Sequence, residues 1–168
     1  MRKLSLLFAI LLLLIVGCQN KETQAALDEM EAKAELNQQN RDLIEKFIRS
    51  WNDQDFQVLD GCLDAEFKLY LPSGTEEPMS LEKSKEWMDN LFATFPDIHY
   101  EIQDVLADND KVCVRWTCTA TYQSDPDDPT NRKEIKGSAI EIYRVVNGLI
   151  TEERAETDSQ GWQEQLGQ

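Results

Sequence analysis

Three patterns of apolar and polar residues follow one another along the chain. Residues 4–16 are almost all apolar, and residues 19–39 are rich in Gln, Glu, Lys, Ala and Asn. The chain is therefore predicted to begin with a short apolar leader and a polar tether that could be helical. A folded domain should start near residue 40, with a helix capped by Asn40 or Asp42. Its apolar positions recur at helical spacing, at Leu43, Ile44, Phe47, Ile48 and Trp51.

Two further helices and one strand are predicted before residue 97. A short helix is expected around residues 56–63, and residues 66–71 read as a strand. Ser80 is a suitable N-cap for the next helix, which Pro96 ends. The apolar stripe of that helix consists of Leu81, Met88, Leu91, Phe92 and Phe95.

After residue 97 the pattern changes to that of β-strands. Residues 98–107 form one strand, and apolar and mostly polar residues alternate over residues 111–122, as in a half-buried antiparallel strand. Asn147-Gly148 separates two further strands, residues 134–146 and 149–158, and is a strong signal for a hairpin. Helices followed by long antiparallel strands predict an α+β fold.

The N-terminal leader has the composition of a secretory signal peptide. Met1-Arg2-Lys3 is basic, and the apolar run that follows is shorter than the about 20 residues that cross a bilayer. The ending Gly17-Cys18 resembles the bacterial lipobox, which implies a lipid on Cys18; the alternative is ordinary cleavage after Gly17. We expect a lipoprotein signal peptide (1–17), a lipidated Cys18 with a tether (18–39) and one domain (40–168).

This leader predicts attachment to a membrane of the bacterial cell envelope through the lipid on Cys18. The outer membrane is the expected location. The polar stretch after Cys18 loosely resembles surface-export signals of some lipoproteins, and it can equally be a solvated spacer. The lipid has to provide the attachment, because an acidic chain is repelled by anionic headgroups.

The charge and the metal-ligand residues exclude two classes of function. The net charge is −15, and it becomes −17 without residues 1–17, which argues against nucleic-acid binding. His99 is the only histidine, so a histidine-rich metal site is excluded, and no Cys-x-x-Cys occurs. Beside Cys18 the chain has Cys62, Cys113 and Cys118, an odd number, so at least one thiol is free or pairs between molecules.

Several motifs, in their order and spacing, resemble the SnoaL-like polyketide cyclase group of the nuclear transport factor 2-like superfamily. They lie between about residues 40 and 167. The resemblance implies a cone-shaped, curved antiparallel sheet around the N-terminal helices, an apolar pocket and frequent dimerisation through the outer sheet face. It also implies that any catalysis needs no cofactor. The motifs are Phe95-Pro96-Asp97-Ile98-His99-Tyr100-Glu101, Val105-Leu106-Ala107-Asp108-Asn109-Asp110-Lys111-Val112, Val114-Arg115-Trp116, and Ile142-Tyr143-Arg144-Val145-Val146-Asn147-Gly148-Leu149-Ile150-Thr151-Glu152.

Enzymes of this group use a pocket carboxylate as acid and base, and such a group needs a raised pKa. Glu141 is one candidate, and its alternative is an ion pair with Arg144 or Arg115, or contact with water. Asp158 and Glu156 are two more, since residues 150, 152, 154, 156 and 158 share a face by parity. Asp158 could instead cap the turn at Ser159.

Aromatic residues are expected to line the pocket, or simply to form the core. Three features depart from the family pattern. Tyr122 stands where a histidine is usual, Arg154 replaces an aromatic residue, and the loop that often reads Gly-x-x-Pro-Thr-Gly keeps only Pro129-Thr130. We therefore favour a membrane-anchored protein that binds a small apolar molecule. The alternatives are a cyclase or isomerase without a cofactor and a non-catalytic interaction module. The expected pocket residues are Trp51, Tyr70, Trp116, Tyr122, Tyr143 and Arg154.

Overall fold

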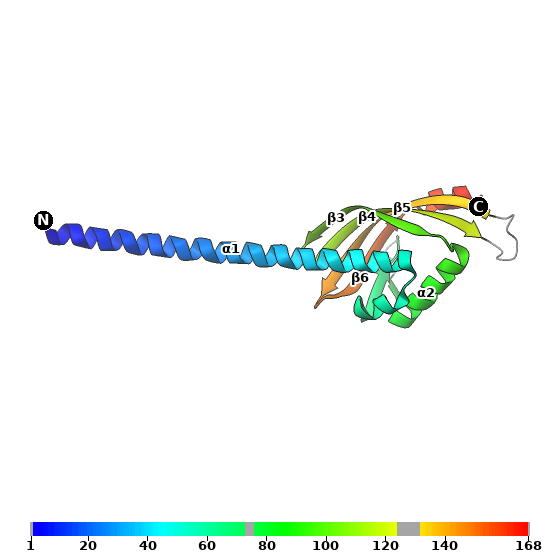
Figure 1. The fold of residues 1–168 in the computed structure, drawn as a ribbon, viewed down its shortest axis with the longest axis horizontal. Coiled ribbons are helices and arrows are strands. Elements are labelled where there is room, and N and C mark those ends of the chain that lie inside the picture. The colour runs from blue at the N-terminus through cyan, green and yellow to red at the C-terminus, as the bar shows by residue number, and fades with distance from the viewer. Residues whose placement is uncertain (1, 73–75, 124–131, 168) are drawn as a thin grey trace. The chain divides into compact units, whose positions relative to one another are not determined.

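The computed structural model describes residues 2–72, 76–123 and 132–167, with side chains from residue 21 onward apart from 77 and 78. The chain divides into two compact units, Met1–Leu36 and Asn37–Gln168. Helix α1 (Arg2–Asp53) belongs to both, so the predicted tether is helical (Figure 1). Within the part of the chain described, no helix is long and apolar enough to cross a membrane.

The second unit contains a six-stranded sheet in the order β2-β1-β6-β5-β4-β3. All neighbouring strands are antiparallel except β1 and β6, which are parallel. The sheet is curved and open, and it arches over α2 and the end of α1 (Figure 1). The predicted α+β class is confirmed. The strands are β1 (Leu63–Tyr70), β2 (Glu76–Pro78), β3 (His99–Asp108), β4 (Lys111–Gln123), β5 (Arg132–Val146) and β6 (Leu149–Thr157).

Three shorter helical segments complete the unit: η1 (Phe56–Gly61), α2 (Leu81–Thr94) and α3 (Ser159–Leu166). Ser80 caps α2 as predicted, because its hydroxyl accepts a hydrogen bond from the Lys83 N–H at 3.2 Å. The expected cap at Asn40 or Asp42 is wrong, because α1 runs through these residues. Asn40 instead donates its side-chain amide to the Asn109 carbonyl at 2.7 Å.

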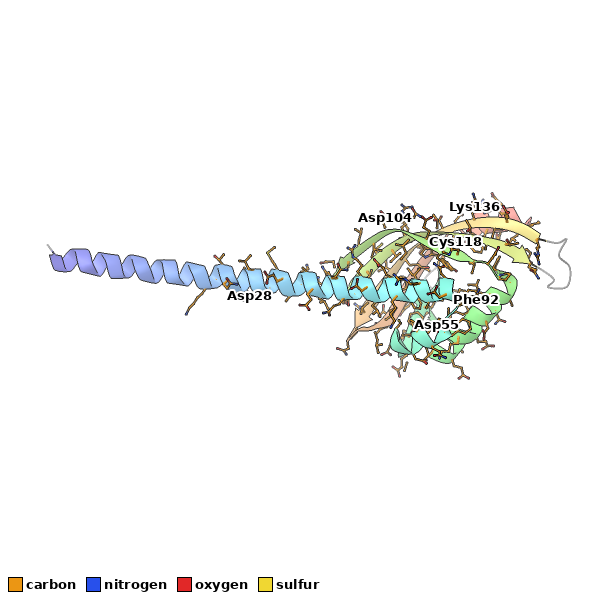
Figure 2. The ribbon with its side chains drawn as sticks, in the orientation of Figure 1. Asp28, Asp55, Phe92, Asp104, Cys118 and Lys136 are labelled. Carbon is orange, nitrogen blue, oxygen red and sulfur yellow. The ribbon has the colours of Figure 1, made fainter. Side chains whose placement is uncertain are left out.

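The two faces of the sheet differ as the alternation in the sequence predicts. On β4 the residues Val112, Val114 and Trp116 are buried, whereas charged side chains such as Asp104 and Lys136 point away from the domain (Figure 2). The predicted hairpin at Asn147-Gly148 is present. Both residues have positive φ, 53° and 76°, which this kind of tight turn requires.

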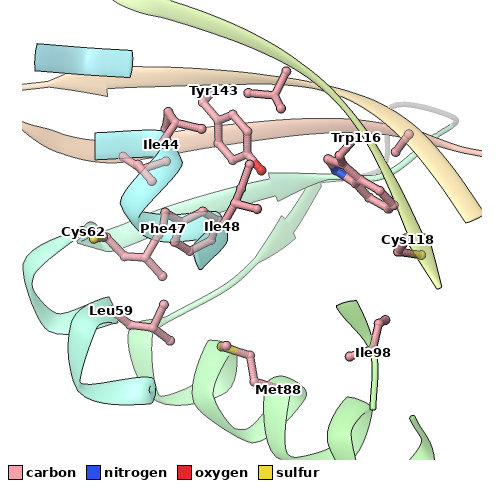
Figure 3. Close-up of a cluster of buried hydrophobic side chains, with 14 of the residues drawn as sticks. Ile44, Phe47, Ile48, Leu59, Cys62, Met88, Ile98, Trp116, Cys118 and Tyr143 are labelled. Atoms are coloured by element: carbon pink, nitrogen blue, oxygen red, sulfur yellow. The ribbon is translucent and has the colours of Figure 1, made fainter. Parts of the chain in front are cut away.

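The hydrophobic core lies between the concave face of the sheet and the helices (Figure 3). Ile44, Phe47 and Ile48 of α1 are buried in it, and the Phe47 ring meets the Tyr143 ring edge-on at 5.9 Å. The side chain of Asn52 pairs with the backbone of Tyr100 in both directions, at 2.9 and 2.7 Å. This double hydrogen bond ties the end of α1 to strand β3.

Candidate functional site

A cavity of about 450 Å³ lies between the sheet and the helices. It is lined by residues of α1, α2, α3 and of strands β1 and β3 to β6. Most of these side chains are apolar, and they come from the same core that holds the domain together. The volume is in the range of cavities that hold small organic molecules.

Aromatic rings form a connected group on one side of the cavity. Trp51 on α1 lies 5.3 Å from Trp87 on α2 and 6.0 Å from Tyr100 on β3, measured between ring centroids. Tyr100 in turn meets Trp116 on β4 at 5.0 Å, nearly perpendicular. Edge-to-face contacts of this kind hold the rings in fixed orientations. Burial raises the pKa of Tyr100, so its phenol stays protonated and can donate a hydrogen bond.

Glu141 is a charged residue that lines the same cavity and is buried, with 7% of its surface exposed. It lies on β5 opposite Val114 and Ala155, and it lines the cavity. Burial raises the pKa of Glu141. The Tyr143 hydroxyl and the Trp116 indole N–H both donate to its carboxylate, and these two bonds oppose the rise by stabilising the anion.

Glu153 on β6 is a second acid in the same cavity. It is the register partner of Tyr143, which places it beside the residue that binds Glu141. Burial and the nearby charge of Glu141 raise its pKa well above the usual range. Glu141 keeps its negative charge more easily than Glu153, because two hydrogen-bond donors stabilise the Glu141 carboxylate. Of the two, Glu141 is therefore the acid that ionises first, and Glu153 keeps its proton to higher pH.

The parity argument from the sequence missed Glu153 because of a β-bulge. The register between β5 and β6 shifts, so that Arg144 pairs with Glu152 and Val145 pairs with Ile150. Thr151 is the extra residue, and it reverses the alternation of β6. Residues 153, 155 and 157 therefore join Ile150 on the concave face, and residues 152, 154 and 156 face outward.

Glu156 and Asp158 consequently lie outside the cavity. Glu156 is exposed on the outer face. Asp158 is the N-cap of α3 and accepts a hydrogen bond from the Gly161 N–H at 2.9 Å, which is the alternative that the sequence left open. Neither carboxylate lines the space in which Glu141 and Glu153 meet.

The six expected pocket residues divide into two groups. Trp51, Trp116 and Tyr143 line the cavity, but the other three do not. Tyr70 and Arg154 are neighbours on the outer side of the sheet, with the guanidinium 3.9 Å from the ring centroid. The remaining residue, Tyr122, packs against Phe95 at the far end of β4.

The C-terminal helix α3 closes one end of the cavity, and the sequence did not predict it. Trp162 lines the cavity and meets the Phe95 ring edge-on at 5.6 Å. Its indole lies directly over Gly137, where a Cβ atom would overlap the ring. Gln165 holds the helix to β5 through two hydrogen bonds with the Lys136 backbone, at 2.8 and 2.9 Å.

A curved open sheet that covers helices and a cavity lined by two carboxylates is the fold of an α+β protein of the nuclear transport factor 2-like class. The chain belongs to the SnoaL-like polyketide cyclase family, whose family model matches residues 41–166. The resemblance inferred from the sequence motifs is thus confirmed. No curated protein matches the chain significantly.

Solved structures of similar proteins share this fold. A SnoaL-like polyketide cyclase from Agrobacterium tumefaciens is 22% identical with a TM-score of 0.64, over 76% of this chain and 97% of that one. IdmH from Streptomyces antibioticus, proposed to be a polyketide cyclase, is 22% identical with a TM-score of 0.66, over 76% and 98%. A protein from Acidithiobacillus ferrooxidans, also proposed to be a polyketide cyclase, is 28% identical with a TM-score of 0.65, over 77% and 94%.

Proposed function

We propose that the cavity binds a small, largely apolar carbonyl compound, and that Glu141 and Glu153 transfer protons to and from it without a cofactor. The observation that carries this proposal is the pair of carboxylates that line the cavity, Glu141 buried and Glu153 half-buried, with unequal surroundings. An acid and a base whose pKa values are separated by their environment are the usual parts of a proton-transfer site. Cyclisation and isomerisation of carbonyl compounds are the reactions that such a site serves.

In the proposed step Glu141 is the general base. It accepts a proton from a carbon next to the carbonyl group, and the electron pair of the broken C–H bond moves toward the carbonyl oxygen. Glu153 donates its proton to that oxygen, so that a neutral enol forms and the negative charge of the cavity passes from Glu141 to Glu153. Tyr100, kept protonated by burial, is a second donor in reach of the same space.

Two of the three departures from the family pattern do not weaken this proposal, and the third, the loop with Pro129-Thr130, lies outside the described residues. Tyr122 and Arg154 lie outside the cavity, so the loss of the family's usual side chains there leaves the carboxylate pair unaffected. Binding without catalysis remains the second candidate, and it is favoured by the largely apolar lining. The two candidates differ in one measurement, the exchange of a carbon-bound proton.

The test uses 2-tetralone, a bicyclic ketone with an acidic C–H group, in deuterated water. We expect the protein to speed deuterium incorporation, observed by NMR, and Glu141→Gln to reduce the rate by about 10²- to 10⁴-fold. Glu153→Gln should reduce it less, since an amide still donates a hydrogen bond. Glu156→Gln, the same change on the outer face of the same strand, is the matched control. Unchanged exchange in Glu141→Gln would refute the assignment.

We propose further that a lipid on Cys18 holds the protein on a membrane of the bacterial cell envelope, the outer membrane being the expected one. The sequence Met1-Arg2-Lys3, the apolar run and Gly17-Cys18 support this. Cells fed an alkyne-tagged fatty acid should label the protein, and Cys18→Ser should abolish the label and release the protein from the membrane fraction. Cys113→Ser is the control, since this cysteine is free on β4.

Association of two copies through the outer sheet face is a further part of the proposal. Leu106 on β3, Cys113 on β4 and Ile142 on β5 are register neighbours there, and Leu106 and Ile142 are exposed. Exposed apolar side chains in one row favour an interface. Sedimentation of the parent and of Ile142→Lys tests this, since a dimer should become a monomer.

A further inference from the structure

The cavity carries negative charge without a compensating cation. Among its described lining residues the titratable ones are Tyr100, Glu141, Tyr143 and Glu153, and none is Lys, Arg or His. The segments 73–75 and 124–131, which lie outside the described residues, contain no basic residue in the sequence. A buried charge normally has a partner of opposite sign, so the missing cation calls for an explanation.

Two consecutive glutamates on β6, Glu152 and Glu153, differ in whether a basic side chain contacts them. Glu152 points outward, where its carboxylate contacts Arg144 at 3.1 Å and Arg154 at 3.5 Å. Glu153 points into the cavity, and no described basic side chain forms an ion pair with it or with Glu141. Two arginines of this strand pair, Arg144 and Arg154, thus form their ion pairs on the outer face.

The rest of the lining suits a cation as well. The rings of Trp51, Trp87, Tyr100 and Trp116 form the connected group described above, next to the hydrogen-bonded unit of Glu141 and Tyr143. The face of an aromatic ring has a negative potential and attracts ammonium groups, most strongly where water is excluded. Tryptophan gives the strongest attraction of this kind.

We propose that the cavity selects an organic monocation, an apolar molecule of about one to two rings that carries a protonated amine or a quaternary ammonium group. The ammonium group lies between the carboxylate pair and the tryptophan rings, and the apolar body fills the remaining space. This inference rests on the proposed function for the location of the ligand and names the class of substrate. It also predicts that carboxylates and phosphates are excluded.

The charge balance explains why one positive charge fits. When Glu141 is ionised and Glu153 keeps its proton, the cavity has a charge of about minus one before a ligand enters. One ammonium group neutralises it and leaves the proton on Glu153 in place for acid–base chemistry. The acidic surface of the whole chain adds a long-range attraction for cations.

The test compares three probes with the same ring system: 1-naphthylmethylammonium, 1-naphthylmethanol and 1-naphthoate. Their affinities for the full chain in a nonionic detergent are measured by calorimetry, with the heat of titration into detergent alone subtracted. We expect the cation to bind at least about tenfold more tightly than the alcohol, a difference of about 1.4 kcal/mol, and the anion not to bind. Glu141→Gln should lower the ratio of cation to alcohol, and the double variant Glu141→Gln/Glu153→Gln, in which neither residue can carry the charge, should bring it close to one. Glu156→Gln should leave the ratio unchanged.

The outcomes separate this inference from the proposed function. If the alcohol binds as tightly as the cation, or if the ratio survives the double variant, the selection for cations is refuted while a ligand site remains. If none of the probes binds, the inference fails, and the deuterium exchange decides the proposed function by itself. Failure of the deuterium exchange alone would remove the catalytic role and leave the selectivity standing. Ala155→Phe, which fills the cavity, should abolish binding of every probe and thereby shows where they bind.

Discussion

Gly137 on β5 is the position where a single methyl group should be most damaging. The glycine lies under the indole of Trp162, and a Cβ atom there would overlap the ring. Its φ angle is not positive, so the backbone itself accepts alanine. Elsewhere in a strand, glycine to alanine would stabilise by about 0.5–1 kcal/mol through the reduced entropy of the unfolded chain.

The expected cost follows from the contacts that the methyl group displaces. Overpacking of a close contact costs about 1–3 kcal/mol. Movement of Trp162 also weakens its edge-to-face contact with Phe95, and such a contact contributes about 0.5–1.5 kcal/mol. We therefore expect Gly137→Ala to lower the free energy of unfolding by about 2 kcal/mol, with part of the cost offset by the entropy gain.

A double-mutant cycle in urea measures this coupling. All four tryptophans lie within residues 37–168, so their fluorescence reports on this unit. In a Trp162→Ala background the same glycine change should cost less than about 0.5 kcal/mol, because the space above it is vacant. Gly61→Ala is the control, since a Cβ there would meet only Lys46 Nζ, at 3.9 Å. An equal cost of Gly137→Ala in both backgrounds would refute the reasoning.

Three further predictions concern other parts of the domain. Because the pKa of Glu153 is raised in the folded protein, its contribution to stability is present below the ordinary carboxyl pKa and is lost as the pH rises through the folded-state pKa. Glu153→Gln should therefore be more stable than the parent at about pH 8, and Glu156→Gln should not. Identical urea midpoints of Glu153→Gln and the parent at all pH values would contradict this. Asn52→Ala removes both hydrogen bonds to the Tyr100 backbone and should cost about 1–3 kcal/mol in the same urea assay, and a change within error would show that this clamp is unimportant. Arg154→Ala should leave the affinity for the naphthyl probes unchanged, since the arginine stacks on the outer face; a loss of binding would place it in the site after all.

The secondary structure and the fold class followed from local patterns. Alternation along β4 and the Asn147-Gly148 turn predicted the central hairpins, and helical spacing before residue 97 predicted the helices that the sheet covers. Local sequence also made Glu141 a candidate, because it is a charged residue between apolar neighbours in the middle of a predicted strand. Short-range geometry decides these features, so the sequence was sufficient for them.

The parts that the sequence did not reveal depend on contacts between distant residues. The parallel pairing of β1 with β6 and the docking of α3 over Gly137 join segments far apart in the chain. The bulge at Thr151 is a property of two paired strands, and one extra residue moved Glu153 into the cavity and moved Arg154 and Glu156 out.

The sequence by itself determined that this chain has a polar segment followed by an acidic α+β domain, because composition and periodicity act locally. Only the tertiary structure decided which two acids share the cavity. Their pKa values and their lack of a basic partner arise from burial and from neighbours on other strands, and no single segment of the chain contains that information.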